Sequence, residues 1–204
     1  MATNPKYLFY LLVLLIVMGF SKATHDKSPQ IKAIKEFTLR NIDNKMVSLG
    51  QFGKAKGFII VFTCNHCPFA KLYAKRLNQL NRKYKKKGVP LLAINSMDSL
   101  LYREESFELM QDMAKREKYN FPYLQDATQE VGKDFNAQHT PKAYVIWKEG
   151  NSWVIKYEGA IDNDGEHPDK AQSYLAQATD ELLNGKQVTL AKTESFGCRI
   201  FYRK

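Results

Sequence analysis

Residues 57–72, GFIIVFTCNHCPFAKL, form the stretch around which the rest of the sequence is organised. The β-branched and aromatic run 58–62 predicts a buried strand, and an amphipathic pattern that begins near Pro68 predicts a helix. Cys64 and Cys67 therefore fall where a strand ends and a helix starts. Free backbone N–H groups and the helix dipole favour a thiolate there, and the spacing is expected to place both sulfurs on the first helical turn, within bonding reach. The stretch predicts a redox-active cysteine pair.

The N-terminal residues 1–23 have the pattern of a secretory signal peptide. Lys6 precedes the uncharged, apolar run 7–20, and small residues flank Lys22 up to Ala23, where cleavage is expected. The run is shorter than the ~20 residues that span a bilayer, and an uncleaved membrane anchor is the alternative interpretation. Both interpretations predict an exported protein, either periplasmic or extracellular.

The remaining sequence predicts one domain. Of 204 residues, 44% are hydrophobic, which suits a single ordinary globular domain. Residues 24–33 are polar and are expected to form a linker, so the domain is assigned to residues 34–204. Much of the net charge of +10 comes from Lys83 and from lysines 85–87 at the end of a predicted helix. This pattern is typical of a solvated helix end, so we expect no nucleic-acid partner and membrane contact only through an uncleaved N-terminal segment.

The order of predicted elements indicates an α/β fold. Gly88 ends the helix that follows the cysteines, and residues 89–95 predict a second buried strand, which completes a βαβ unit with parallel strands. The cysteines then lie at the C-terminal edge of the first strand, where open α/β sheets build their sites. The other expected elements are a hairpin in 34–52 around Asp43-Asn44, helices at 68–87, 99–119, 127–135 and 170–183, a short strand at 121–124, and a hairpin with strands 143–147 and 153–157.

This order, with CxxC at the start of a helix and Thr140-Pro141 before the second hairpin, resembles the thioredoxin superfamily. The leading segment FTLRNIDNKMVSL is similar to the entry of the redoxin branch, which includes alkyl hydroperoxide reductase and thiol-specific antioxidant proteins. FTCNHCPFAK, YEGAIDN and the closing GCRI resemble a group of exported thioredoxin-like proteins with a third cysteine near the C-terminus. The resemblance implies a thioredoxin fold with an N-terminal β-hairpin and a helical insertion, in which helices flank a mixed central sheet.

The resemblance also implies roles for two residues of the second motif. Pro141 is expected to form a cis peptide bond and to face the cysteine pair. Thr140, which precedes it, is expected to line the substrate with its backbone. An X-Pro bond is cis in only ~5% of cases in folded proteins, so this expectation depends on the family and not on the dipeptide.

The chemistry expected of the pair is thiol-disulfide exchange. Cys64 comes first at the start of the helix and is expected to be the more exposed cysteine, so it is predicted to be the better stabilised thiolate and to attack the disulfide of the partner. Cys67 is predicted to resolve the mixed disulfide that results. His66 is expected to stabilise the reduced thiolate and make the disulfide more oxidising, or else to be a solvent-exposed turn residue without influence. We expect an enzyme without a cofactor that acts on protein dithiols, protein disulfides or small thiols and is served by an upstream redox partner.

The pair has four alternative interpretations. A structural disulfide is disfavoured because the closed loop is tiny, and zinc because the chain has only one CxxC pair. A copper-binding or copper-delivery module would use Cys64, Cys67 and His139, although related copper proteins space their cysteines by three residues. A peroxiredoxin-like thiol peroxidase with antioxidant activity is the other alternative. The residue three before Cys64 is Val61, however, and not the Thr or Ser that activates a peroxidatic cysteine.

Phe58 and Cys198 are two further positions that bear on the chemistry of the pair. The buried acid that thioredoxins carry on the strand before the cysteines is replaced here by Phe58, so the sequence does not identify a group that moves protons at Cys67. Cys198 is an additional redox candidate or a merely free thiol in the tail. It reaches the pair only if residues 190–200 fold back over the active-site edge.

Overall fold

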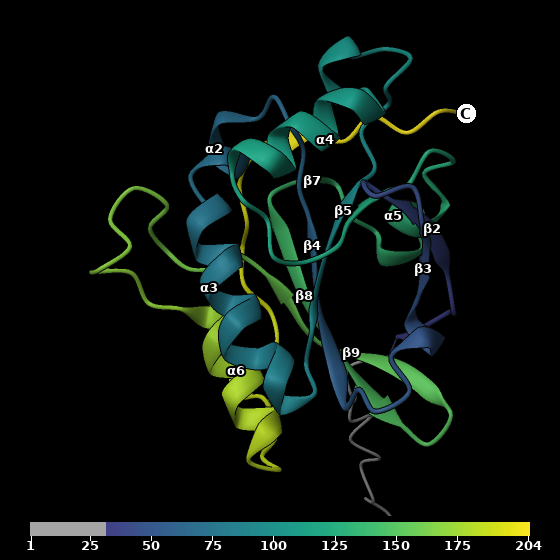
Figure 1. The fold of residues 1–204 in the computed structure, drawn as a ribbon. Coiled ribbons are helices and arrows are strands. Elements are labelled where there is room, and N and C mark those ends of the chain that lie inside the picture. Colours follow the sequence, from purple (N-terminus) through teal and green to yellow (C-terminus); the bar gives the residue numbers. More distant parts are fainter. Residues whose placement is uncertain (1–31) are drawn as a thin grey trace, which may run out of the picture. The chain divides into compact units, whose positions relative to one another are not determined.

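The computed structural model describes residues 32–204, which belong to one compact unit that starts at Ile31 (Figure 1). The predicted signal peptide, its alternative as a membrane anchor, and most of the predicted linker lie outside the described residues. Ala33 already belongs to the first strand, so the predicted linker boundary at residue 33 is late by one residue. Within residues 32–204, no helix has the length and apolar character that a membrane crossing requires.

A mixed eight-stranded sheet forms the centre of the domain, in the order β1-β9-β8-β4-β5-β6-β2-β3. The central strand β4 runs parallel to β5 and antiparallel to β8. The βαβ unit and both hairpins are therefore confirmed, with β2 and β3 at one edge of the sheet. The strands of this sheet are β1 (Ala33–Ile34), β2 (Thr38–Asn41), β3 (Met46–Ser48), β4 (Gly57–Phe62), β5 (Leu91–Asn95), β6 (Tyr123–Gln125), β8 (Lys142–Glu149) and β9 (Ser152–Gly159).

Strand β4 is buried on both faces, which explains its unbroken apolar run. Ile59 and Val61 point into a core shared with the helices α3 (Ala74–Tyr84), α4 (Phe107–Arg116) and α6 (Tyr174–Leu183). Alternate residues of β4 belong to a second core, closed by α5 (Glu130–Phe135) and the N-terminal hairpin. Figure 1 shows α3 and α6 beside each other on one side of the sheet. The helices thus fix the strand whose end carries the cysteines.

The helix after the cysteines is broken, although the sequence predicts one helix over 68–87. It consists of α2 (Pro68–Lys71) and α3, and a 3-10 turn follows at Lys85–Lys87. Gly88 ends it in the left-handed conformation, as predicted, at φ +86°. The break brings the hydroxyl of Tyr73 to within 2.9 Å of Asp162 Oδ1, and Arg76 pairs with the same buried carboxylate. These tertiary contacts override the local helical preference.

The helix predicted at 99–119 is also shorter than expected. A 3-10 turn at Arg103–Glu105 precedes α4, and Ser106 caps α4 by accepting a hydrogen bond from the Leu109 N–H at 3.3 Å. The cap ends the preceding turn and directs Glu105 into the protein interior. Helices α5 and α6 likewise start three and four residues later than predicted.

The C-terminal tail folds back along the sheet edge that carries the cysteines. Thr193 N–H donates to the carbonyl of Glu158 at 3.0 Å, so the tail first follows the end of β9. It then forms β10 (Cys198–Arg199), which pairs antiparallel with β7 (His139–Thr140). Figure 1 shows this tail in yellow, from α6 back to the C-terminus beyond α4. The condition for Cys198 to approach the cysteine pair is therefore met.

Candidate active site

The two cysteines lie directly after β4, but they occupy different local positions. Cys67 is the N-cap residue of α2, whereas Cys64 lies in the turn before the helix. Both are free thiols, and only 2% of Cys64 and none of Cys67 is exposed. The expectation that both sulfurs share the first helical turn is wrong, because the helix begins at Pro68. Cys64 is the more exposed of the two by a negligible margin.

The second predicted motif faces the pair. The Thr140-Pro141 peptide bond is cis, as the resemblance implied. The Cys64 sulfur lies 2.9 Å from Thr140 Oγ1, and the Cys67 sulfur lies 3.3 Å from the carbonyl oxygen of Thr140. Thr140 is completely buried, and its strand edge pairs with Cys198 of the chain's own tail. The structure therefore brings Cys64, Cys67, Thr140 and Pro141 together as predicted, and it adds the tail.

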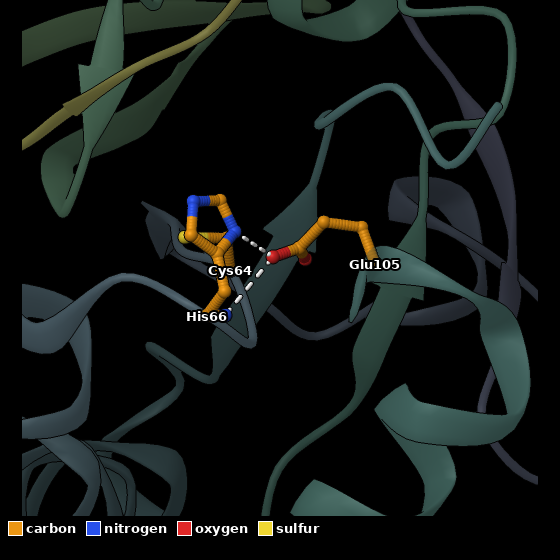
Figure 2. Close-up of side chains that lie close together, drawn as sticks. All are labelled: Cys64, His66 and Glu105. Carbon is orange, nitrogen blue, oxygen red and sulfur yellow. Dashed lines mark hydrogen bonds and ion pairs between the residues drawn. The ribbon is translucent and has the colours of Figure 1, made fainter. Parts of the chain in front are cut away.

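A buried carboxylate lies beside the pair, and sequence reasoning did not find it. Glu105 is 1% exposed and accepts hydrogen bonds from both backbone N–H groups of Asn65 and His66, at 2.9 and 3.0 Å. The Asn95 side chain donates to it at 2.6 Å. Figure 2 shows the carboxylate aimed at the turn that carries Cys64. The segment before α4 thus supplies an acid to this site. In thioredoxins, the acid lies on the strand before the cysteines, where β4 of this chain has Phe58.

His66 has defined contacts in this arrangement. Its Nδ1 lies 2.5 Å from Glu105 Oε1, and its ring stacks on Tyr102 with centroids 5.6 Å apart. About a third of the side chain, 32%, is exposed. His66 is therefore more than a freely exposed turn residue, and its influence on the thiolate stays a prediction. Glu105 fixes both the backbone and the ring of His66, so this residue holds the turn before Cys67 in shape.

The thiols differ in how readily they ionise. The hydrogen bond from Cys64 lowers the pKa of Cys67 to about 4 against the effect of burial, and donors from Cys198 and the Ala70 backbone add to this. The same hydrogen bond raises the pKa of Cys64 far above its usual range, and burial and the charge of Glu105 raise it further. These directions disfavour Cys64 as the better stabilised thiolate, because the hydrogen bond from Cys64 favours charge on Cys67.

One contact opposes this distribution of charge. The carbonyl oxygen of Thr140, 3.3 Å from the Cys67 sulfur, favours a protonated thiol. Four donor groups lower the pKa of the same thiol, namely the thiols of Cys64 and Cys198 and the backbone N–H groups of Ala70 and Cys198. Because a sulfur with several donors and one acceptor is better satisfied as an anion, we assign the negative charge of the reduced site to Cys67.

The reduced protein is expected to hold one thiolate from about pH 4 upward. The pKa of Cys67 is lowered to about 4, and that of Cys64 is raised, so the pair should lose one proton early and keep the other. Ultraviolet thiolate absorbance, followed during a pH titration, measures this directly. Cys67→Ser should remove the low-pH step. A wild-type titration without a step below the ordinary thiol range of about 8.5 would contradict the assignment.

Cys198 is half-buried and lies opposite Thr140, the residue that both cysteines of the pair contact. Burial and the interaction with the Cys67 thiol raise the pKa of Cys198 to about 12. Its thiol is therefore a donor to Cys67 in the reduced protein. The sequence left open whether Cys198 is near the pair, and the structure places it there.

The groups that could bind a metal do not form the predicted copper set. Among residues 32–204, the one cluster of three ligand-type side chains within 4.8 Å of one another is Cys64, His66 and Glu105 (Figure 2). His139 is not in this cluster, and its Nε2 lies 2.8 Å from Ser195 Oγ. The copper set of Cys64, Cys67 and His139 is therefore not assembled. Four N–H or ring-nitrogen groups already form hydrogen bonds with the Glu105 carboxylate. These bonds explain why the three side chains lie close together, and no metal is needed to explain it.

A groove of about 420 Å³ runs beside Pro141 and is lined in part by residues 193–196 of the tail. Exposed aromatic and aliphatic side chains form part of its wall, notably Phe69, Leu72 and Phe196. Large exposed apolar groups that gather beside a reactive site are typical of a binding surface. The groove gives an extended partner a place to lie next to the cis-proline.

The fold and the cysteine site agree with the comparison of the chain with known proteins. Residues 31–161 match the AhpC/TSA family, and the chain belongs to this family. Solved structures of similar proteins, among them StoA from Bacillus subtilis, share its thioredoxin-like α/β fold, which confirms the predicted fold class. The relatives that carry this name place the chain among the oxidoreductase enzymes of the thioredoxin-like class.

Three similar proteins show the range of relatives. The thiol-disulfide oxidoreductase ResA from Bacillus cereus is 26% identical over 155 residues, which cover 71% of this chain and 84% of ResA. The probable glutathione peroxidase 2 from Arabidopsis thaliana is 31% identical over 125 residues, which cover 60% of this chain and 68% of the relative. An uncharacterized conserved protein from Geobacillus kaustophilus has a solved structure that covers 86% of this chain and 93% of its own. Its TM-score is 0.77 at 35% identity.

Proposed function

We propose that the chain is a thiol-disulfide oxidoreductase in which Cys64 and Cys67 exchange disulfides with protein or small-thiol partners. The observation that carries the proposal is the contact of both sulfurs with Thr140, the residue before cis-Pro141, at the end of the central strand. The pKa values of the two thiols depend on each other, as expected for neighbouring thiols of one site. The kinship with thiol-disulfide oxidoreductases supports the same chemistry.

The roles of the two thiols follow from their surroundings. In the oxidised form, a partner thiolate attacks the sulfur of Cys64, the disulfide to Cys67 breaks, and Cys67 leaves with the electron pair. A thiol with a low pKa leaves faster, and the low pKa of Cys67, about 4, favours it as the leaving group. The second thiol of the partner then attacks the mixed disulfide, and Cys64 is released and takes up a proton. The partner is oxidised and the enzyme is reduced.

The same stabilisation bears on the direction of electron flow. A thiolate that is favoured in the dithiol form stabilises the reduced enzyme, which makes the disulfide a stronger oxidant. We therefore propose that the pair is more oxidising than that of thioredoxin. An upstream redox partner must then accept electrons from the reduced enzyme and restore its disulfide.

The proposed compartment is outside the cytoplasm, either the periplasm or the extracellular space. The signal-like order of residues 1–23 supports it, and an oxidising compartment suits a disulfide that must be regenerated. N-terminal sequencing of the protein recovered from a secreting host would show whether the chain starts after Ala23. A protein that keeps residues 1–23 and stays with the membrane fraction would support the anchor instead.

The reduction of insulin by dithiothreitol, followed by turbidity, tests the proposed activity. The full chain is expected to accelerate the reaction, and Cys64→Ser is expected to return it to the uncatalysed rate. Thermal unfolding of both proteins shows whether the variant is folded. Equal rates with the wild type and a folded Cys64→Ser variant would refute a catalytic role of Cys64.

A further inference from the structure

The tail holds Cys198 in a fixed position, because it is anchored on both sides of this residue. Before it, Thr193 pairs with the end of β9. After it, the Ile200 N–H donates to the Gln138 carbonyl at 2.8 Å, and the Gln129 side chain donates to the Phe201 carbonyl at 2.9 Å. Anchors at both ends limit the motion of the residue between them. Cys198 therefore remains opposite Thr140, as the register of β10 and β7 shows.

Gly197 permits the close approach of the tail to the cis-proline motif. Its φ of +155° is unfavourable for other residues, and a Cβ added there would lie 1.8 Å from the carbonyl oxygen of Thr140. A side chain at this position would therefore push β10 away from β7. The sequence Gly197-Cys198 thus combines a close backbone contact with a thiol at the next residue.

The three cysteines meet at Thr140. Cys64 Sγ lies 2.9 Å from Thr140 Oγ1, Cys67 Sγ lies 3.3 Å from the Thr140 carbonyl oxygen, and Cys198 is the partner of Thr140 in the pairing of β10 with β7. The Cys67 thiol also affects the pKa of both other thiols, so either of them can compete for a disulfide with it. In the oxidised enzyme, where Cys67 is bonded to Cys64, Cys198 is the neighbouring free thiol.

We propose that Cys198 is a third redox cysteine, which exchanges with the pair to form an alternative Cys67–Cys198 disulfide. The Cys198 thiolate attacks Cys67 Sγ, the S–S bond between Cys64 and Cys67 breaks, and the electron pair leaves on Cys64. The proton that Cys198 loses is balanced by the proton that Cys64 gains. One disulfide replaces another, so the step consumes no oxidant or reductant. The inference rests on the proposed function insofar as the Cys64–Cys67 disulfide is the starting state.

The exchange gives the oxidised enzyme two forms with different reactivity. With a Cys64–Cys67 disulfide, the chain can oxidise a dithiol partner. With a Cys67–Cys198 disulfide, Cys64 is a free thiol beside Glu105, and the tail is covalently tied to the active-site edge. The oxidising equivalent is then stored in a bond between Cys67 and the tail, and reversal of the exchange returns it to Cys64.

Disulfide mapping of the full-length chain tests the proposal. Cys64→Ser keeps two of the three thiols, and on mild oxidation with oxidised glutathione it should lose both as a monomer, with a Cys67–Cys198 cross-linked peptide in a non-reducing digest. In the wild type, the same peptide should appear beside the Cys64–Cys67 peptide, and Cys198→Ser should abolish it. A Cys64→Ser protein that keeps its two thiols, or that forms only intermolecular disulfides, would overturn the proposal.

Gly197→Ala provides the geometric test and covers the case in which Cys64→Ser folds poorly. It should slow the formation of the Cys67–Cys198 bond by about tenfold to a hundredfold, as expected when reacting groups move by about 1 Å, and leave the Cys64–Cys67 bond unaffected. Equal rates in Gly197→Ala and wild type would count against a role of the tail geometry. Disulfide mapping does not depend on catalytic turnover. If the Cys67–Cys198 bond is mapped but the insulin assay shows no activity, only the proposed function is refuted. If the insulin assay shows activity but the Cys67–Cys198 bond does not form, only this inference is refuted.

Discussion

Replacement of Cys67 by serine is expected to abolish turnover and to trap the partner as a mixed disulfide on Cys64. Removal of the resolving group of a covalent mechanism costs about a thousandfold or more in rate. The loss of Cys67 also removes the hydrogen bond that contributes most to the raised pKa of Cys64, so Cys64 becomes easier to ionise. Mass spectrometry after incubation with oxidised glutathione should show one glutathione per chain, attached at Cys64.

Cys64→Ser is the matched control for this trap. It keeps the low-pKa thiol Cys67 but lacks the thiol that is assigned to partner exchange. In this variant, Cys67 should pair with Cys198 and not retain glutathione. Stable glutathione on Cys67 in Cys64→Ser, together with none on Cys64 in Cys67→Ser, would reverse the assigned roles.

Replacement of Glu105 by alanine is expected to cost about 3–5 kcal/mol of folding free energy, because several buried donors lose their acceptor at about 1–3 kcal/mol each. The variant leaves the N–H groups of Asn65 and His66 and the Asn95 amide without their acceptor, and each buried donor that is left unpaired is costly. For a domain of this size, the loss corresponds to a decrease in Tm of about 10 °C, measurable by calorimetry. A change within about 1 kcal/mol would contradict the role assigned to this carboxylate.

Glu105→Gln separates the charge of this residue from its shape. The amide retains an acceptor oxygen for the turn at Asn65 and His66, so the variant should be more stable than Glu105→Ala. Loss of the negative charge removes one of the causes of the raised pKa of Cys64. The second thiolate step in the pH titration should therefore move to lower pH. An unchanged titration with lowered stability would make Glu105 a structural residue and not a positioning residue for the thiols.

Several features of the site could be predicted because they depend on local sequence patterns. The apolar run of β4 predicts a buried strand, and the order of strands, helix and CxxC predicts the βαβ unit that carries the pair. Thr140-Pro141 was found through resemblance, since nothing in a Thr-Pro dipeptide by itself indicates a cis bond. In each case the signal lies within a few residues or in a family motif.

The parts of the site that the sequence did not predict depend on contacts between distant segments. Glu105 follows Glu104 in a polar segment, and a buried acid there looks the same in the sequence as an exposed one. The strands β7 and β10 have two residues each, too few for an alternating pattern. The break between α2 and α3 likewise depends on Asp162, which reaches it from beyond β9. A group of polar residues that converge only in the folded chain leaves no periodic signal.

The reduction potential of the Cys64/Cys67 couple tests the central claim most directly. The full chain with Cys198→Ser isolates the couple, and equilibration in glutathione buffers followed by thiol alkylation and mass analysis counts the oxidised molecules. We predict one two-electron transition with a midpoint less negative than about −270 mV, the value for thioredoxin, because the Cys67 thiolate stabilises the dithiol form. A pair that stays fully reduced across the series, or a midpoint more negative than about −270 mV, would contradict this account.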